Sequence, residues 1–392
     1  MKRVSQRLAR LPGSATMAIS NRARELRAEG KEVISFAAGE PDFPTPEHIV
    51  AAAARAGNDP ANHKYTANQG LPQLREAISE YTRTYSGMSV EVSEIVVTNG
   101  AKQAVFQTFA ALLDPGDEVL VPAPYWVTYP AGIDLAGAAT VAVPTTAAAG
   151  FKATVDDLEA ARTVRTQALV FVSPSNPTGA VYTADEARAI GEWAAENNIW
   201  IIADEIYQRL YYDGDVAPSI AALTPRAENW VLINGVAKSF AMTGWRVGWM
   251  IGPDDIMAAA ARHQSHSTSN VANVSQHAAL AALTGPQDTV EEMRDAFDRR
   301  RRLMFSLINE VPGFSCVEPE GAFYVFPDVS AALTDRCPTS ASLAEMIIDR
   351  AGVALVPGES FGTPGFLRLS YALNEADIER GVGQIADLIG TL

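Results

Sequence analysis

One lysine of this 392-residue chain stands where its amine could act as a nucleophile. Lys238 follows the apolar run 231–233 and is surrounded by small residues, in the segment Asn234-Gly-Val-Ala-Lys-Ser-Phe-Ala-Met-Thr-Gly-Trp-Arg246. Little bulk would crowd this amine, and partial burial would lower its pKa toward useful nucleophilicity. A surface lysine on a loop is the alternative interpretation of this segment.

Such a lysine could form a Schiff base with an aldehyde, which is how pyridoxal phosphate is held. Arg246, eight positions after Lys238, offers a planar fork for a phosphate. The ring of that cofactor takes up electrons when its nitrogen is protonated, and a nearby carboxylate keeps it so. Asp204 ends the apolar run 200–203, at the carboxyl end of an expected strand, where parallel sheets bind ligands. An Asp at this place can instead be only a helix cap.

Other side chains could complete a site of this kind. Tyr207 follows Asp204 by three positions, and Asn176 lies between two prolines, so both could reach the ring oxygen of the cofactor. Trp126 could stack on a flat ring. The turn at Ala101 and Lys102 could bind a phosphate through the first amides of a helix. A plain Pro-Gly turn around Asn176 and a core position for Trp126 are the alternatives.

Arg368 is the candidate for binding a substrate carboxylate. It lies between two leucines on the alternating segment Phe366-Leu-Arg-Leu-Ser-Tyr371. An arginine in such surroundings costs free energy unless it meets a carboxylate. The pattern therefore indicates an acidic ligand at this segment.

Short apolar strands alternate with helical segments along most of the chain. The strands are apolar throughout, which is typical of a sheet covered on both faces. A helix opens after the capping box Thr183-x-x-Glu186. These patterns predict an α/β fold with a mostly parallel sheet. The expected strands are 94–98, 118–121, 140–143, 168–172, 200–203, 231–234 and 247–250.

The rhythm changes after residue 284. Residues 287–311 predict one long charged helix that is solvated or bridges two domains, and the rest alternates short strands and helices. We expect a large domain at 47–299 and a smaller α+β domain built from 1–46 and 300–392. This division agrees with the two or three domains that the length suggests.

The composition limits the kinds of partner. Lys and Arg number 31 against 46 Asp and Glu, a net charge of −15, which argues against nucleic-acid binding. An anionic substrate must then meet local Arg and Lys residues. No segment reaches the roughly 18 uninterrupted apolar residues of a membrane span, and two cysteines build no disulfide framework, so we expect a cytoplasmic protein. The pair His263 and His266 has no evident third ligand, so no metal is expected.

The ordered set of motifs resembles the class I, fold type I pyridoxal-phosphate aminotransferases, and among them the bacterial aspartate aminotransferases of the Ib branch. The resemblance covers nearly the whole chain. Its motifs are Ala38-Gly39-Glu40-Pro41-Asp42-Phe43, Lys64-Tyr65, Pro124-Tyr125-Trp126, Ser175-Asn176-Pro177-Thr178-Gly179, Asp204-Glu205-Ile206-Tyr207, Ala237-Lys238, Gly244-Trp245-Arg246, Gly321-Ala322-Phe323-Tyr324 and Arg368-Leu-Ser-Tyr371.

The resemblance implies a role for each candidate. Lys238 would form the Schiff base and move the proton, Asp204 would pair with the ring nitrogen, and Asn176 and Tyr207 would contact the ring oxygen. The remaining cofactor contacts would come from Trp126 on the ring and from Arg246, Ala101, Lys102 and Tyr65 toward the phosphate. Because Tyr65 would reach across from a neighbouring subunit, a homodimer is implied.

The resemblance also implies a substrate site formed by Gly39, Trp126, Asn176, Arg368, Lys102 and Thr16. Arg368 would bind the α-carboxylate, and Lys102, with help near Thr16, would bind the second carboxylate of a dicarboxylic amino acid. The related branch that uses an arginine for this purpose is not matched, since 263–273 contains none. The implied reaction moves the amino group of L-aspartate to 2-oxoglutarate, giving oxaloacetate and L-glutamate.

Two positions and one pair of residues depart from common patterns of the family. Gly235 stands where many relatives have a hydroxyl residue, Ala101 stands where Gly is frequent, and Gln208-Arg209 is not the expected pair. The alternatives are an aminotransferase for prephenate, aromatic or other amino acids, and a pyridoxal-phosphate C–S β-lyase. A catalytically silent binding protein is a further class, but the lysine it would have lost is present.

Overall fold

The centre of the molecule is a seven-stranded sheet, ordered β2-β8-β7-β6-β5-β3-β4. The computed structural model describes residues 3–5, 8–9, 11, 13, 15–224 and 229–392, without the side chains of residues 15–17 and 20. β8 runs antiparallel to both of its neighbours, and the other pairs are parallel. The strands are β2 (Ile95–Thr98), β3 (Glu118–Ala123), β4 (Ala139–Pro144), β5 (Thr166–Val172), β6 (Trp200–Asp204), β7 (Trp230–Gly235) and β8 (Gly248–Ile251).

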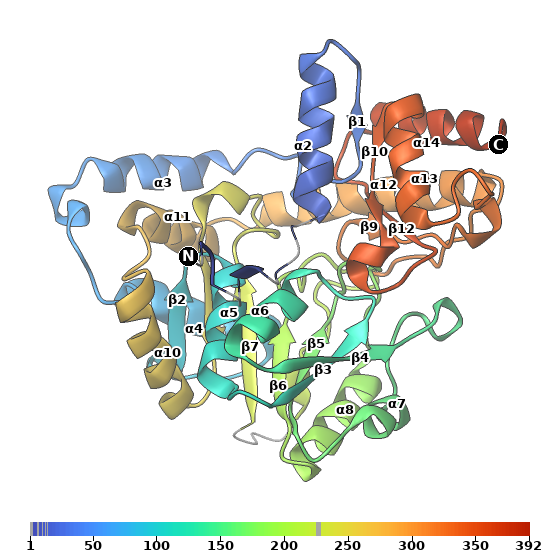
Figure 1. The fold of residues 1–392 in the computed structure, drawn as a ribbon. Coiled ribbons are helices and arrows are strands. Elements are labelled where there is room, and N and C mark those ends of the chain that lie inside the picture. Colours follow the sequence, from blue (N-terminus) through green and yellow to red (C-terminus); the bar gives the residue numbers. More distant parts are fainter. Residues whose placement is uncertain (1–2, 6–7, 10, 12, 14, 225–228) are drawn as a thin grey trace.

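Helices cover both faces of this sheet (Figure 1). Side chains of one β-strand alternate between two cores, as when Ile95 and Val97 join one cluster and Val96 the other. One face is covered by α3 (Glu47–Gly57), α4 (Pro72–Ser86), α7 (Val155–Ala161), α8 (Ala184–Glu196), α9 (Ile220–Leu223) and α11 (Asn273–Thr284). The other is covered by α5 (Ala101–Leu112), α6 (Thr128–Ala136) and α10 (Asp254–Ser267).

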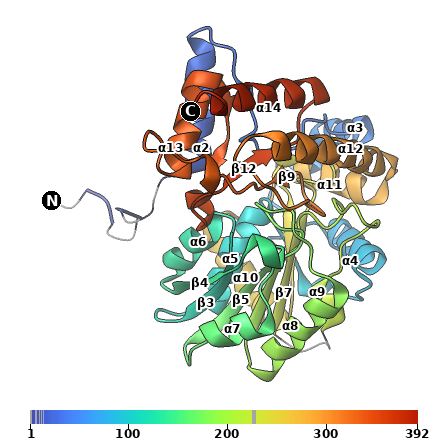
Figure 2. The same cartoon turned by 90° about the vertical axis from the view of Figure 1, so that its right-hand side faces the viewer.

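A second, smaller part packs at one end of the large sheet (Figure 2). It contains the three-stranded sheet β11-β12-β9 and the two-stranded parallel sheet β1-β10. Its elements are α2 (Ala15–Ala28), β1 (Ile34–Ser35), β9 (Tyr324–Val325), α13 (Ser340–Met346), β10 (Val353–Ala354), β11 (Val356–Pro357), β12 (Leu367–Ser370) and α14 (Glu375–Ile389). The N-terminal and C-terminal segments therefore meet here, as β1 pairs with β10.

One long helix, α12 (Asp288–Glu310), connects the two parts. Its four consecutive arginines each meet an acidic partner, which accounts for a basic run in an acidic protein. Arg300 pairs with Asp42 at 2.7 Å, across 258 residues of sequence. Arg301 is nearly buried and bonds Glu318 as well as Asp298, so this stretch is not simply a solvated surface. The bridging interpretation of the helix agrees with these contacts.

The expected fold class is confirmed. Every expected strand is present to within a residue or two at its ends, and the capping box at Thr183 and Glu186 starts α8 at the next residue. The structure adds that β8 is antiparallel, which a run of apolar residues does not indicate. Among the described helices, none is both long and apolar enough to cross a membrane.

Candidate active site

Three of the candidate residues follow three neighbouring parallel strands. Asp204 is the last residue of β6, Asn176 follows β5, and Lys238 follows β7. These strands pair directly with one another, so their carboxyl ends lie at the same edge of the sheet. The fold thereby brings together residues that are far apart in the sequence.

The amine of Lys238 lies near two aromatic rings and a backbone carbonyl oxygen. Its Nζ donates a hydrogen bond to the carbonyl oxygen of Gly39 and lies 5.8 Å from the ring centre of Tyr207 and 5.7 Å from that of Phe323. Burial lowers the pKa of Lys238 to about 8, although the Glu40 carboxylate acts in the opposite direction. A substantial fraction of this amine is therefore neutral near pH 8, as a nucleophile or base requires.

The carboxylate of Asp204 is buried, with 3% of the residue exposed. Its Oδ2 accepts a 2.8 Å hydrogen bond from the Tyr129 hydroxyl, and its Oδ1 accepts one from the Ile206 amide at 3.2 Å. Burial raises the pKa of Asp204, while these two hydrogen bonds and the charge of Lys238 lower it. Such a carboxylate would gain from a cationic partner that itself donates an N–H. Sequence reasoning missed Tyr129, because nothing in its local pattern distinguishes it from a core tyrosine.

A second buried carboxyl group, that of Glu205, faces away from this site. Its Oε1 accepts from the Ser219 hydroxyl at 2.8 Å, and its Oε2 has no partner among the described residues. Burial raises the pKa of Glu205 to about 8. Since an unfolded Glu has a pKa near its ordinary value, the folded chain holds a proton here that the unfolded chain releases, and stability falls as the pH rises toward 8.

Glu205→Gln should remove this pH dependence. Relative to the variant, the wild type should lose about 1 kcal/mol of unfolding free energy per pH unit between about pH 5 and 8, and no more above pH 8. Denaturant unfolding of both proteins at several pH values measures the difference. A constant difference between pH 5 and 9 would show that Glu205 titrates normally.

Arg368 occupies β12 and is 2% exposed. Its Nη1 donates to the Asn176 side-chain oxygen and its Nη2 to the carbonyl oxygen of Ala37, both at 3.0 Å. Its Nε is buried and has no partner among the described residues. A guanidinium in this state still has donors to offer, and a planar carboxylate is the group that fits them.

Tyr207 lies between these groups. Its hydroxyl is 3.0 Å from the hydroxyl of Tyr324, the first residue of β9, and both rings are buried. Burial raises the pKa of Tyr207 well above its ordinary value, so its phenol is a neutral donor. Tyr324, like Tyr129, was not among the candidate site residues.

Positive charge gathers at the start of α5. Gly100 precedes this helix with a φ of 78°, and a side chain there would overlap the guanidinium of Arg246. Arg246 donates to the carbonyl oxygens of Thr243 and Asn99, at 2.9 and 3.2 Å. The Lys102 amine lies 5.0 Å from the Trp126 ring centre, and burial followed by the charge of Arg246 lowers the pKa of Lys102. Together with the first amides of α5 at Ala101, these groups suit an anion.

Two of the departures from the family pattern, Gly235 and the pair Gln208-Arg209, can be described from the structure. Gly235 pairs with Gly248 across β7 and β8, and a Cβ on Gly235 would lie 2.9 Å from the Gly248 Cα, so a hydroxyl residue does not fit there. Gln208 and Arg209 are buried against the end of α4: Gln208 donates to Ser86 at 2.9 Å, and Arg209 stacks 4.0 Å from the Tyr85 ring centre. These two side chains therefore pack against the end of α4.

For two candidate residues, Tyr65 and Thr16, the described part of a single chain shows no side-chain contact with the other candidates. Tyr65 is 88% exposed, in the segment between α3 and α4. The side chain of Thr16 lies outside the described residues, although the backbone of this residue belongs to α2. The contributions of Tyr65 and Thr16 therefore stay predictions.

The residues present fit pyridoxal phosphate. The buried Asp204 carboxylate suits the protonated ring nitrogen, and the lowered pKa of Lys238 suits condensation with the aldehyde. The cations and amides at the start of α5 suit the phosphate. A group of three or more His, Cys, Asp or Glu that could hold a metal ion is not found among the described residues.

The site combines Lys238, the buried Asp204 and Arg368 on a mostly parallel sheet. This arrangement is typical of a pyridoxal-phosphate enzyme of the transferase type. The chain belongs to the class I and II aminotransferase family, whose model matches residues 31–385. It is therefore a pyridoxal-phosphate-dependent aminotransferase, and the cofactor and enzyme class implied by the resemblance are confirmed.

Characterised relatives cover almost the whole chain. An aspartate aminotransferase of Streptomyces avermitilis is 52% identical over 394 residues, with 99% of this chain and 97% of the relative aligned. An aspartate/prephenate aminotransferase of Thermus thermophilus is 41% identical, with 100% of both chains aligned. A solved structure of Thermus thermophilus aspartate aminotransferase with maleate superposes with a TM-score of 0.94 at 41% identity, covering 99% of this chain and 100% of that one.

Proposed function

We propose that this aminotransferase moves the amino group of L-aspartate to 2-oxoglutarate, giving oxaloacetate and L-glutamate. The proposal rests chiefly on Arg368, whose buried and unpartnered Nε suits a substrate carboxylate beside Lys238. Lys102 supplies a second cation for the side-chain carboxylate of a dicarboxylic amino acid. The names of the relatives in Streptomyces avermitilis and Thermus thermophilus support aspartate, and the maleate in the solved structure is itself a dicarboxylate.

Bound pyridoxal phosphate supplies an aldehyde that condenses with amines and a protonated ring that accepts the electron pair left when Cα loses its proton. The work of Lys238 is to hold this group and, once its own amine is released, to take the Cα proton and return it. A pKa of about 8 allows the amine to accept and release that proton near neutral pH. The Gly39 carbonyl oxygen, which accepts a hydrogen bond from this Nζ, gives the free amine a fixed position.

Asp204 and Tyr207 prepare the ring for this chemistry. The Asp204 carboxylate, oriented by Tyr129 and the Ile206 amide, keeps the ring nitrogen protonated. The Tyr207 phenol would donate to the ring oxygen, and Asn176, which accepts a hydrogen bond from Arg368, would contact the same oxygen. Trp126 would cover the ring, and Arg246 with the amide of Ala101 would hold the phosphate.

The proposal includes a homodimer and two domains. Tyr65 projects fully from its own chain, as expected of a residue that reaches the phosphate of a neighbouring subunit, and the solution mass of the protein tests this. The large domain would comprise 47–299 and the small domain 1–46 with 300–392. Most of the apolar cluster around Val325 and Leu369 comes from the small domain, and Tyr207 and Phe297 join it from the large one. A cytoplasmic location is proposed on the composition alone.

Arg368→Gln tests the carboxylate assignment. Loss of a buried partner charge should lower kcat/KM by about 10²–10³-fold for aspartate and for alanine alike, since both carry the α-carboxylate. With saturating cofactor, Lys102→Gln should lower kcat/KM for aspartate about tenfold and change kcat/KM for alanine little, because only aspartate has a second carboxylate. The rate at which each amino acid changes the absorbance of the bound cofactor gives these constants directly.

The same amino-acid panel decides between substrates. A wild-type preference for phenylalanine or tyrosine over aspartate, with no selective effect of Lys102→Gln, would contradict the dicarboxylate proposal. Prephenate is the second candidate substrate, because the Thermus thermophilus relative is named for aspartate and prephenate together. Turnover with both acids would extend the proposal to that pair.

A further inference from the structure

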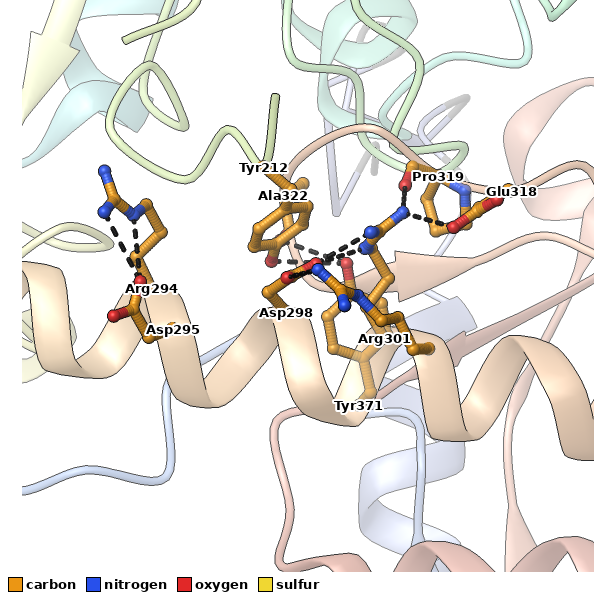
Figure 3. Close-up of polar contacts among 10 residues, drawn as sticks. Tyr212, Arg294, Asp295, Asp298, Arg301, Glu318, Pro319, Ala322 and Tyr371 are labelled. Atoms are coloured by element: carbon orange, nitrogen blue, oxygen red, sulfur yellow. Dashed lines mark hydrogen bonds and ion pairs between the residues drawn. The ribbon is translucent and has the colours of Figure 1, made fainter. Parts of the chain in front are cut away.

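Two pairs of tyrosine hydroxyl groups join the loop after β6 to the smaller part of the molecule. The Tyr207 and Tyr324 hydroxyls lie 3.0 Å apart, and the Tyr371 hydroxyl donates to that of Tyr212 at 3.3 Å. Tyr212 donates to the carbonyl oxygen of Ala322, and this oxygen also lies 3.2 Å from the Tyr371 hydroxyl as a second acceptor for its one proton, beside α12 (Figure 3). The first pair faces Lys238, and the second lies against Asp298 and Arg301 of α12.

Tyr324 touches both ends of the proposed site. Its hydroxyl meets Tyr207, while the guanidinium of Arg368 lies 4.5 Å from the centre of its ring. A Cβ on Gly39 would lie 3.3 Å from the Tyr324 hydroxyl oxygen, so the backbone that receives the Lys238 hydrogen bond also runs close to this residue. Tyr324 is 1% exposed, and its position is set by its place in β9.

The direction of the Tyr207–Tyr324 hydrogen bond follows from counting protons. Each phenol has one proton to donate and an oxygen that accepts. If the Tyr207 proton is donated to the ring oxygen of the cofactor, as the proposed function holds, then the proton between the two tyrosines belongs to Tyr324. Hydrogen bonds in such a chain polarise and strengthen one another.

We infer that Tyr324 is a positioning residue for both Tyr207 and Arg368. Its hydroxyl strengthens the donation from Tyr207 to the ring oxygen, and its ring supports the plane of the Arg368 guanidinium. The inference rests on the proposed roles of Tyr207 and Arg368. The two functions of this side chain can be tested separately, because Tyr324→Phe keeps the ring and removes only the hydroxyl group.

Other charged groups face Tyr207 and must be held constant in a test. The charges acting on Tyr207 are those of Arg368, which lowers its pKa, and Asp204, which raises it. The Lys238 amine lies over its ring, and Tyr129 is close enough for the two phenols to interact electrostatically. Glu40 and Arg246 act on Lys238 in turn. None of these groups is changed by Tyr324→Phe.

The test is a pH titration of the absorbance of the bound cofactor in the holoenzyme. In Tyr324→Phe, weaker donation from Tyr207 leaves the ring oxygen more basic, so the proton it shares with the Lys238 nitrogen is held more tightly. The midpoint should rise by a few tenths of a pH unit, because the lost hydroxyl strengthens the Tyr207 hydrogen bond but does not make it. Tyr371→Phe is the matched control, because it removes the other hydroxyl pair of the same junction and should leave the midpoint unchanged.

The ring of Tyr324 has a separate test. Tyr324→Leu should raise KM for aspartate about 5–30-fold through loss of the contact with Arg368, while Tyr324→Phe should change this KM little. An unshifted midpoint in a fully coloured Tyr324→Phe protein would overturn the inference, as would an equal shift in Tyr371→Phe. A wild-type protein that binds no cofactor at Lys238 would instead contradict the proposed function.

Discussion

Lys238→Ala should lower kcat by at least about 10⁴-fold. General acid–base catalysis alone contributes about 10²–10⁴-fold, and this variant also loses the covalent attachment of the cofactor. The neutral amine that burial makes available near pH 8 has no replacement, since Gly39 offers only a carbonyl oxygen at that place. Single-turnover reaction with aspartate, followed by the absorbance of the cofactor, measures the loss.

Lys152→Ala is a suitable control for this experiment. Lys152 pairs with Glu186 at 2.8 Å, at the start of α8, and its removal should leave turnover unchanged. Reduction of the wild type with borohydride, followed by peptide mapping, should place the label on Lys238. A label on another lysine, or wild-type turnover in Lys238→Ala, would refute the assignment.

Asp204→Asn should have the second-largest effect, a fall in kcat of about 10²–10⁴-fold. The amide keeps the shape of the carboxylate and its acceptor for Tyr129 but removes the charge. Leaving the ring nitrogen without a buried partner charge costs about 3–5 kcal/mol, which gives this range. The measurement is kcat at saturating cofactor, so that weaker binding is not mistaken for slower chemistry.

Glu205→Gln provides the matched control, since it makes the same chemical change at the adjacent buried carboxyl. Glu205 faces Ser219 rather than the site, so kcat should stay within about twofold of wild type even though stability at high pH changes. An equal loss of kcat in both variants would mean that replacing either buried carboxyl group at the end of β6 disturbs the enzyme. The assignment of Asp204 would then fail.

The sequence allowed the fold and much of the site to be predicted for one physical reason. Apolar strands place the residues that follow them at one edge of a parallel sheet, so Asn176, Asp204 and Lys238 could be located by their positions after runs of Val, Ile and Leu. The resemblance then supplied a role for each, and the family, cofactor and enzyme class were confirmed.

What the sequence did not indicate depends on contacts between distant segments. Tyr129 bonds Asp204 across 75 positions, and Tyr324 meets Tyr207 across 117. Tyr129 has no local pattern that separates it from a core aromatic residue, and Tyr324, although it ends a motif of the resemblance, was given no role there. The pair Gln208 and Arg209 was noted as a departure from the family pattern, and its contacts with α4 likewise depend on segments that are distant in the sequence.

The contact between α5 and β8 has an architectural consequence. A Cβ on Gly248 would lie 2.7 Å from the carbonyl carbon of Gly100, so the helix start rests directly on bare main chain. No side chain lies between the two backbones at this point, so a change of side-chain size there could not shift the helix. The height of its first amides above the sheet, and the place of Arg246 beside them, are therefore set by van der Waals contact between main-chain atoms.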